Sequence, residues 1–201
     1  MNQARALVLV ALLPALAVAS ERLLPQRVVQ GQTIVSKSDT PIRVEVTGSF
    51  KYVGGQRFIL RQTTDAEQHF FVEADDRKTV QRLYWIQFEH FLPERDGEYS
   101  YDRDEPLTLG ELGFRVHVRR YAEPPASDSD RGAAYAYLER AGYVVPTLAT
   151  RVRLVHVPPE NRRQEVMIVY VEAPTTSGEP DDAEAASIVE RARAGLSIAP
   201  R

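Results

Sequence analysis

The chain has 201 residues, with 25 lysines and arginines against 28 aspartates and glutamates, and it contains no cysteine. The absence of cysteine excludes a disulfide framework, a thiolate zinc site and a cysteine nucleophile. A formal net charge of -3 without a long basic run argues against a nucleic-acid partner. The length suits one domain, which can bury a core without disulfides.

The N-terminal residues have the pattern of a secretory signal peptide. Arg5 precedes an apolar run over residues 6–19, and Ala17 and Ala19 supply the small side chains of a cleavage site before Ser20. The run falls short of the roughly 20 residues that cross a bilayer. We therefore expect residues 1–19 to be removed, and the mature protein to be periplasmic or extracellular without membrane insertion.

Alternating apolar and polar residues predict an antiparallel β-meander of about five strands. The strands are expected over residues 44–52, 57–62, 68–74, 80–91 and 114–118. Gly54 and Gly55 predict a hairpin turn between the first two strands, because this turn requires positive backbone φ angles. Residues 80–91 carry large apolar groups on both faces, which indicates a central strand covered on both sides.

Helical spacing appears twice in the C-terminal half. Residues 127–142 predict a helix that Ser127 or Ser129 caps and Gly142 ends. Strands over residues 150–157 and 164–172 form a second hairpin, whose second apolar face that helix should cover. After a linker at 174–180, an apolar stripe predicts an amphipathic helix near residues 185–196.

These elements predict an α+β fold, with a twisted antiparallel β-meander of about five strands, one helix, a second β-hairpin and a C-terminal amphipathic helix. A curled, barrel-like sheet is the alternative. The chain divides into a signal peptide at 1–19, an extended lead at 20–40, a single α+β domain at 41–173, and a linker with the C-terminal helix at 174–201.

Two groups of side chains are candidate binding sites. Aromatic residues concentrate in the first four predicted strands, and a curved sheet would place an apolar ligand pocket beside Tyr84, Trp85, Phe88, Phe70 and Phe58. The alternative is that these residues fill the core. A predicted anion patch consists of Arg115, His117, Arg119, Arg151 and Arg153. It requires that two strands be neighbours, and a solvated sheet face explains the pattern equally well.

The sequence predicts no catalytic residue, metal site or cofactor. It lacks the nucleophile elbow, the H-E-x-x-H helix, the phosphate loop and the dinucleotide fingerprint, and its four histidines have no metal-ligand spacing. The favoured function is a noncatalytic exported binding or interaction module, whose partner is an apolar small molecule or an envelope protein.

Two alternatives remain open for the function. The first is an exported enzyme that uses dispersed acid and base residues such as His69, Glu73, Glu89 or His156. The second is an envelope assembly or scaffold component that docks through Ile188, Val189 and Leu196 of the C-terminal helix.

Overall fold

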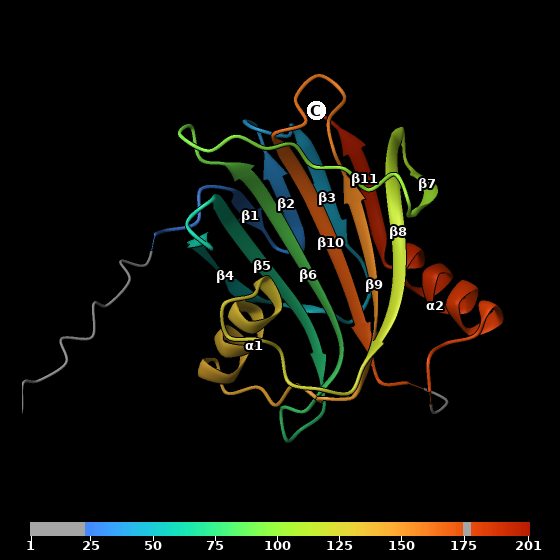
Figure 1. Cartoon of the computed structure of the whole chain (residues 1–201). Helices are drawn as coiled ribbons and strands as arrows, with labels where there is room; N and C mark the ends of the chain where they lie inside the picture. The colour runs from blue at the N-terminus through green and yellow to red at the C-terminus, as the bar shows by residue number, and fades with distance from the viewer. Residues whose placement is uncertain (1–22, 175–177) are drawn as a thin grey trace, which may run out of the picture.

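The computed structural model describes residues 23–174 and 178–201, which form eleven strands and two helices. The strands make two antiparallel sheets that pack face to face, and helix α1 covers part of the outer face of the larger sheet (Figure 1). The β-rich architecture expected from the sequence is confirmed. Neither sheet closes into a barrel within these residues. The predicted signal peptide lies outside the described residues.

The larger sheet has seven strands in the order β4-β5-β6-β10-β9-β8-β7, and all neighbouring strands are antiparallel. Their bounds are β4 (Lys51–Leu60), β5 (Thr64–Ala74), β6 (Val80–Phe91), β7 (Glu105–Leu109), β8 (Leu112–Tyr121), β9 (Ala149–His156) and β10 (Gln164–Glu172). Successive side chains alternate between the two faces. Tyr84 and Ile86 of β6 therefore face the smaller sheet, while Leu83 and Trp85 face α1. Strand β6 is covered on both faces, as its sequence indicated.

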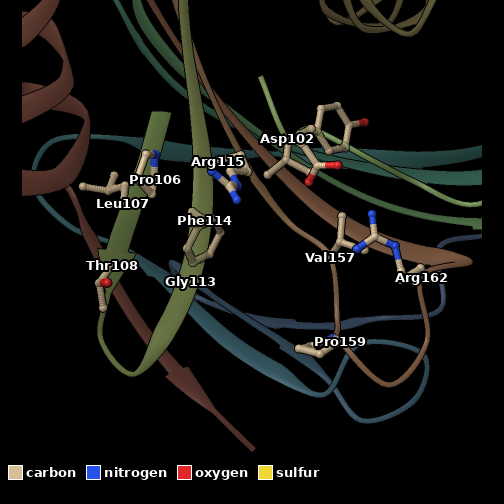
Figure 2. Close-up of a pocket in the computed structure, with 12 residues that line it drawn as sticks. Asp102, Pro106, Leu107, Thr108, Gly113, Phe114, Arg115, Val157, Pro159 and Arg162 are labelled. Atoms are coloured by element: carbon tan, nitrogen blue, oxygen red, sulfur yellow. The ribbon is translucent and has the colours of Figure 1, made fainter. Parts of the chain in front are cut away.

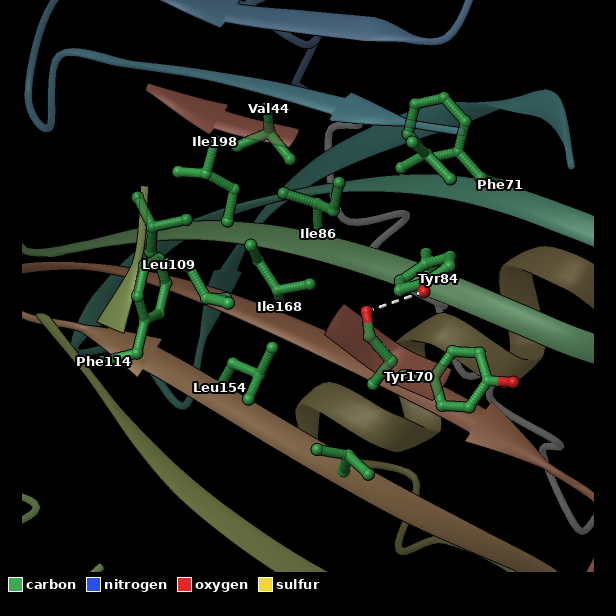
Figure 3. Close-up of a cluster of buried hydrophobic side chains, with 14 of the residues drawn as sticks. Val44, Phe71, Tyr84, Ile86, Leu109, Phe114, Leu154, Ile168, Tyr170 and Ile198 are labelled. Carbon is green, nitrogen blue, oxygen red and sulfur yellow. Dashed lines mark hydrogen bonds between the residues drawn. The ribbon is translucent and has the colours of Figure 1, made fainter. Parts of the chain in front are cut away.

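The smaller sheet has four strands in the order β1-β2-β3-β11 and lies behind the larger one in Figure 1. Its bounds are β1 (Val28–Gln30), β2 (Thr33–Ser36), β3 (Ile42–Val46) and β11 (Leu196–Pro200). Figure 3 shows Val44 and Ile198 of this sheet above Ile86 and Ile168 of the larger sheet, in one apolar core. Because β11 pairs with β3, segments near both ends of the chain complete this sheet.

Helix α1 (Asp130–Arg140) has the expected cap and the expected position. The Ser129 side chain accepts from the Gly132 backbone N–H at 2.9 Å, and Gly142 has a φ of 85° just after the helix. Leu138 is fully buried against the outer face of the larger sheet, in a cluster with Trp85 and Val169. The expectation that this helix covers the second apolar face is confirmed.

Helix α2 (Asp182–Ala194) docks on the core with Ile188 and Ala192, which are 1% and 0% exposed. The Tyr84 hydroxyl donates a hydrogen bond to the Ala192 carbonyl at 2.8 Å, drawn as the dashed line in Figure 3. Arg120 of β8 pairs with Glu184 in the first turn of the helix. The predicted C-terminal helix is therefore part of the folded core.

Several expected details of the strands were wrong. The predicted strand at 44–52 is divided between β3 and β4, which belong to different sheets. The glycine pair lies inside β4, where a β-bulge separates Tyr52 from Gly54. A side chain at Gly54 would collide with the Tyr137 hydroxyl, and one at Gly55 would collide with the His69 ring. The pair therefore allows close packing and does not form the hairpin turn.

The chain also has more strands than the predicted meander of about five. The expected extended lead contributes β1 and β2, and β7 and β11 had no counterpart among the predicted elements. Neither helix of the described chain is long and apolar enough to span a membrane.

Candidate functional site

Strands β8 and β9 bring the residues of the predicted anion patch together. The two strands are neighbours, with His117 opposite Arg153 and Arg119 opposite Arg151. Arg115 lies two residues before His117, and alternation places all five side chains on the outer face of the larger sheet, the face that α1 partly covers. The adjacency on which the prediction depended is therefore present.

One half of this patch has an acidic partner. Arg153 forms an ion pair with Asp104 at 2.8 Å, and the His117 ring nitrogen Nδ1 lies 3.4 Å from the same carboxylate. Arg115 donates to the backbone carbonyl of Asp104 at 3.2 Å. These three residues fit the alternative of a sheet face with local acidic partners.

The other half gathers three guanidinium groups around one aromatic ring. Arg131, Arg151 and Arg119 lie 4.1, 4.7 and 5.3 Å from the ring centroid of Tyr121. Arg151 also donates to the Tyr121 hydroxyl at 2.8 Å. We call these four residues the arginine cluster. Strands β8 and β9 and the first turn of α1 each contribute to it.

Within the described residues, no ion pair links the three arginines of the cluster to a carboxylate. Arg131 Nη1 is buried and has no hydrogen-bond partner. Burial lowers the pKa of the Arg151 guanidinium; Tyr121 and Asp130 oppose this shift, and repulsion from Arg153 and Arg131 adds to it. A bound anion would relieve this repulsion.

The cluster borders a cleft of about 660 Å³. Arg119, Tyr121 and Arg131 line one part of it, and Leu148, which is 47% exposed, supplies an apolar wall. The other lining residues are Arg120, Ala122, Glu123, Gly178 and Glu179. Arg120 is already paired with Glu184, and its backbone N–H bonds to Glu179. The cleft is large enough for a small molecule that carries an oxyanion and an apolar part.

The residues of the predicted apolar pocket are divided between two faces. Phe70 and Trp85 are buried beneath α1, whereas Tyr84 and Phe88 are buried between the two sheets. Phe58 is half-buried on β4, opposite Ala66 of β5. Because the sheet itself separates these side chains, the five do not line a common cavity. Four of them are nearly inaccessible and fill the two cores.

Two other clefts have partly apolar walls. A cleft of about 580 Å³ lies between the β7–β8 hairpin and the chain that follows β9, with Asp102, Arg115 and Arg162 among its lining residues (Figure 2). Another, of about 480 Å³, lies between α2 and the strands β7 and β8. Its apolar lining residues are Pro106, Leu107, Val116, Val118, Ala185, Ala186 and Val189.

The proposed acid and base residues His69 and Glu73 are both engaged in hydrogen bonds, His69 in a buried network. His69 Nε2 donates to Glu67 at 2.7 Å, and His69 Nδ1 lies 3.0 Å from the Tyr52 hydroxyl. His69 and Glu67 are 0% and 1% exposed, and burial raises the pKa of Tyr52 to about 12. Such a network links β4 to β5 and offers no ionised phenol at neutral pH. Glu73, the other half of the suggested pair, instead contacts Ser49 and Arg82.

The remaining candidates are also in structural contacts. His156 lies with Nδ1 2.8 Å from the Gly113 carbonyl, and it is 8% exposed. Ile188, expected to dock on a partner, is buried in the chain's own core, while Val189 and Leu196 are partly buried against it. No group of three or more histidine, aspartate or glutamate side chains with metal-binding geometry occurs in the described part of the chain.

Comparisons with protein-family models, with curated proteins and with solved structures found no match to this chain. The candidate site therefore depends on its own geometry. Sequence reasoning missed Tyr121 and Arg131. Tyr121 continues the alternation of Arg115, His117 and Arg119, which was a usable signal. Arg131 approaches from a separate helix, and no local pattern indicates it.

Proposed function

We propose that this chain is an exported, noncatalytic module that binds an anionic ligand at the arginine cluster. The observation that carries the proposal is the set of three guanidinium groups around Tyr121. None of them forms an ion pair in the described chain, and two of them, Arg119 and Arg131, line an open cleft. Export rests on the signal-peptide pattern of residues 1–19.

The chemistry of the cluster favours an oxyanion. A guanidinium group presents planar N–H donors that match phosphate, sulfate or carboxylate oxygens in paired hydrogen bonds. Tyr121 stacks with the guanidinium groups and limits their freedom, so less entropy is lost when a ligand binds. Leu148 adds apolar surface beside the charged groups. The preferred ligand is therefore an organic phosphate, sulfate or carboxylate.

The proposal is tested by thermal unfolding with inorganic phosphate and sulfate as probes, at constant ionic strength set with chloride. At ten times the dissociation constant, a ligand stabilises the fold by about 1.4 kcal/mol. For a chain of this size that raises Tm by about 3–6 °C. Arg131→Met should abolish the shift, while Arg77→Met, at an exposed turn, should preserve it. An equal shift in all three proteins, or none in the unmodified chain, refutes the proposal.

The cleft beside α2 favours a second candidate, which is binding of an apolar molecule or of an apolar segment of an envelope protein. Seven of its lining residues are apolar and come from both the helix and the sheet edge. An apolar fluorescent probe should bind there, and Val189→Asp should abolish the fluorescence gain while Val28→Asp, at an exposed strand position, should not. Equal fluorescence in both variants argues against this candidate.

A further inference from the structure

Two glutamates lie directly opposite each other on the outer face of the larger sheet. Glu89 of β6 pairs in register with Glu165 of β10, and the two residues are 8% and 2% exposed. Side chains at directly opposed positions of an antiparallel pair lie on the same face, with Cβ atoms about 5 Å apart. Two groups that would repel each other when ionised are therefore adjacent and shielded from water.

Tyrosines from one segment cover this pair. The Tyr99 hydroxyl donates to Glu89 Oε2 at 3.0 Å, and the Tyr101 hydroxyl donates to Glu165 Oε2 at 2.7 Å. Both tyrosines belong to residues 92–104, which connect β6 to β7. The backbone of this segment is held by Arg162, whose carbonyl accepts from the Tyr99 N–H at 2.8 Å. The segment is therefore fastened to the sheet through the two glutamates and through the loop after β9.

A fixed amide completes the hydrogen bonding of Glu89. Gln87 Oε1 accepts from Trp85 Nε1 at 2.8 Å and from Gln68 Nε2 at 2.5 Å, so its amide nitrogen faces the glutamate. That nitrogen donates to Glu89 Oε1. This oxygen is therefore held as an acceptor, which favours the other oxygens of the pair as sites for a proton.

Neutralising cations are missing around the pair in the described part of the chain. Neither glutamate forms an ion pair. Arg153 of β9 lowers the pKa of Glu165 by its charge, but its guanidinium is bonded to Asp104. Helix α1 adds the negative charge of Asp130, while β5 presents only Ala66 opposite Glu89. Burial raises the pKa of Glu89 to about 7, and burial together with the Glu89 charge raises the pKa of Glu165.

We infer that Glu89 and Glu165 share one proton at neutral pH and form a proton-binding site that fastens residues 92–104 to the sheet. Loss of the proton puts two negative charges next to each other in a buried position, and hydration of both requires the segment to lift. Tyr101 and Asp102 of this segment line the cleft in Figure 2, so the proton also controls one wall of that cleft.

Thermal unfolding between pH 5 and 8.5 tests the inference. A carboxyl whose folded pKa exceeds its unfolded value stabilises the fold below the unfolded pKa, and this stability is lost as pH rises through the folded pKa. Between pH 4.5, the ordinary pKa of a glutamate, and pH about 7, the pKa of Glu89 in the folded chain, the loss of one proton lowers the folding equilibrium constant up to tenfold per pH unit. Glu89→Gln and Glu165→Gln should each weaken this decline and unfold at a higher temperature than the unmodified chain at pH 8.5.

Glu73→Gln is the matched control, because Glu73 is a partly exposed glutamate on β5 paired with Arg82. It should leave the decline between pH 5 and 8.5 as in the unmodified chain. Hydrogen exchange of residues 92–104, corrected for intrinsic rate, should accelerate at pH 8.5 in the unmodified chain and remain slow in Glu89→Gln. The infrared C=O band of a protonated carboxyl at pH 6.5 should disappear when both Glu89 and Glu165 are replaced by glutamine. A decline unchanged by both glutamine variants, or equal exchange at the two pH values, would overturn the inference.

Discussion

The two faces of the seven-stranded sheet are buried by different means. Between the sheets, Ile86, Leu154 and Ile168 are fully buried in a continuous apolar core. The outer face is covered chiefly by α1. The 11 residues of this helix span about 16 Å, whereas the seven strands side by side make a sheet about 29 Å wide. The arginine cluster lies at one end of this helix, where the first turn of α1 meets β8 and β9. Apolar burial therefore stabilises the first face, while the second has room for polar chemistry.

The difference between the faces is tested most strongly by identical substitutions on each side. Leu154→Ala removes a side chain enclosed between two sheets, and it should lower the free energy of unfolding by about 4 kcal/mol. Leu138→Ala, in α1, should cost about 3 kcal/mol, because one peripheral helix can move to fill part of the cavity. Urea unfolding measures both values. An equal or larger loss for Leu138→Ala would contradict the assignment of the sandwich as the main core.

A second test concerns polar residues on the face of the larger sheet that packs against the smaller sheet. Glu67 accepts from the backbone N–H groups of Gln26 and Arg27 at 2.8 and 2.9 Å, and from His69 and the Arg27 side chain. Because truncating a buried ion pair leaves one charge unpaired, Glu67→Gln should cost about 3 kcal/mol at pH 7. Asp65 of the same strand, in its ion pair with Arg57, is the comparison: Asp65→Asn should cost less.

The pH dependence of the Glu67 effect has a definite sign. Burial alone would raise the pKa of Glu67, but hydrogen bonds from His69 and the N-terminal backbone, with the charge of Arg27, lower it to about 2. A lowered folded pKa stabilises the protein fully above the unfolded value of 4.5, and this stability is lost as pH falls toward 2. The difference between the unmodified chain and Glu67→Gln should shrink across that range. A constant difference from pH 7 to pH 3 would refute the assignment.

Neighbouring arginines on β8 provide a third comparison, since they point to opposite faces. Arg120 is 6% exposed and bonds to Glu184 and to Thr150, whereas Arg119 is exposed beside Tyr121. Arg120→Met should cost about 3 kcal/mol because it removes the cation of a buried ion pair. Arg119→Met should change stability by less than about 0.5 kcal/mol. Similar losses in urea unfolding would show that both arginines have structural roles.

Regular alternation and helical spacing predicted the long elements. Residues 80–91 and 164–172 became β6 and β10 with the expected bounds, and Ser129 caps α1. The short strands β1, β2, β7 and β11 have three to five residues each, too few for a clear period. Glycine is equally suited to a turn and to close packing, so the pair at 54–55 could not be assigned from sequence alone.

The sequence could predict only those parts of the candidate site that lie close together along one strand. Arg115, His117 and Arg119 share a strand face by alternation. Arg151 and Arg153 share another, but the connection between the two strands contains α1, so no local pattern showed that the strands are neighbours. The ion pairs that neutralise one half depend on Asp104, which lies in a separate segment. The opposition of Glu89 and Glu165 depends on the register between β6 and β10, which no local pattern specifies. Long-range register therefore determines the chemistry on this face.

The last test links the helix cap to the arginine cluster. Ser129→Ala removes the acceptor for the Gly132 N–H and should cost about 1 kcal/mol, and Asp181→Ala, which removes the α2 cap to Glu184, should cost a similar amount. Arg131 lies in the first turn that Ser129 fixes, so only Ser129→Ala should also reduce the Tm shift produced by phosphate. An equal reduction in both variants would mean that the phosphate response follows global stability. A reduction confined to Ser129→Ala ties the response to the outer face, where α1 positions Arg131 beside Tyr121.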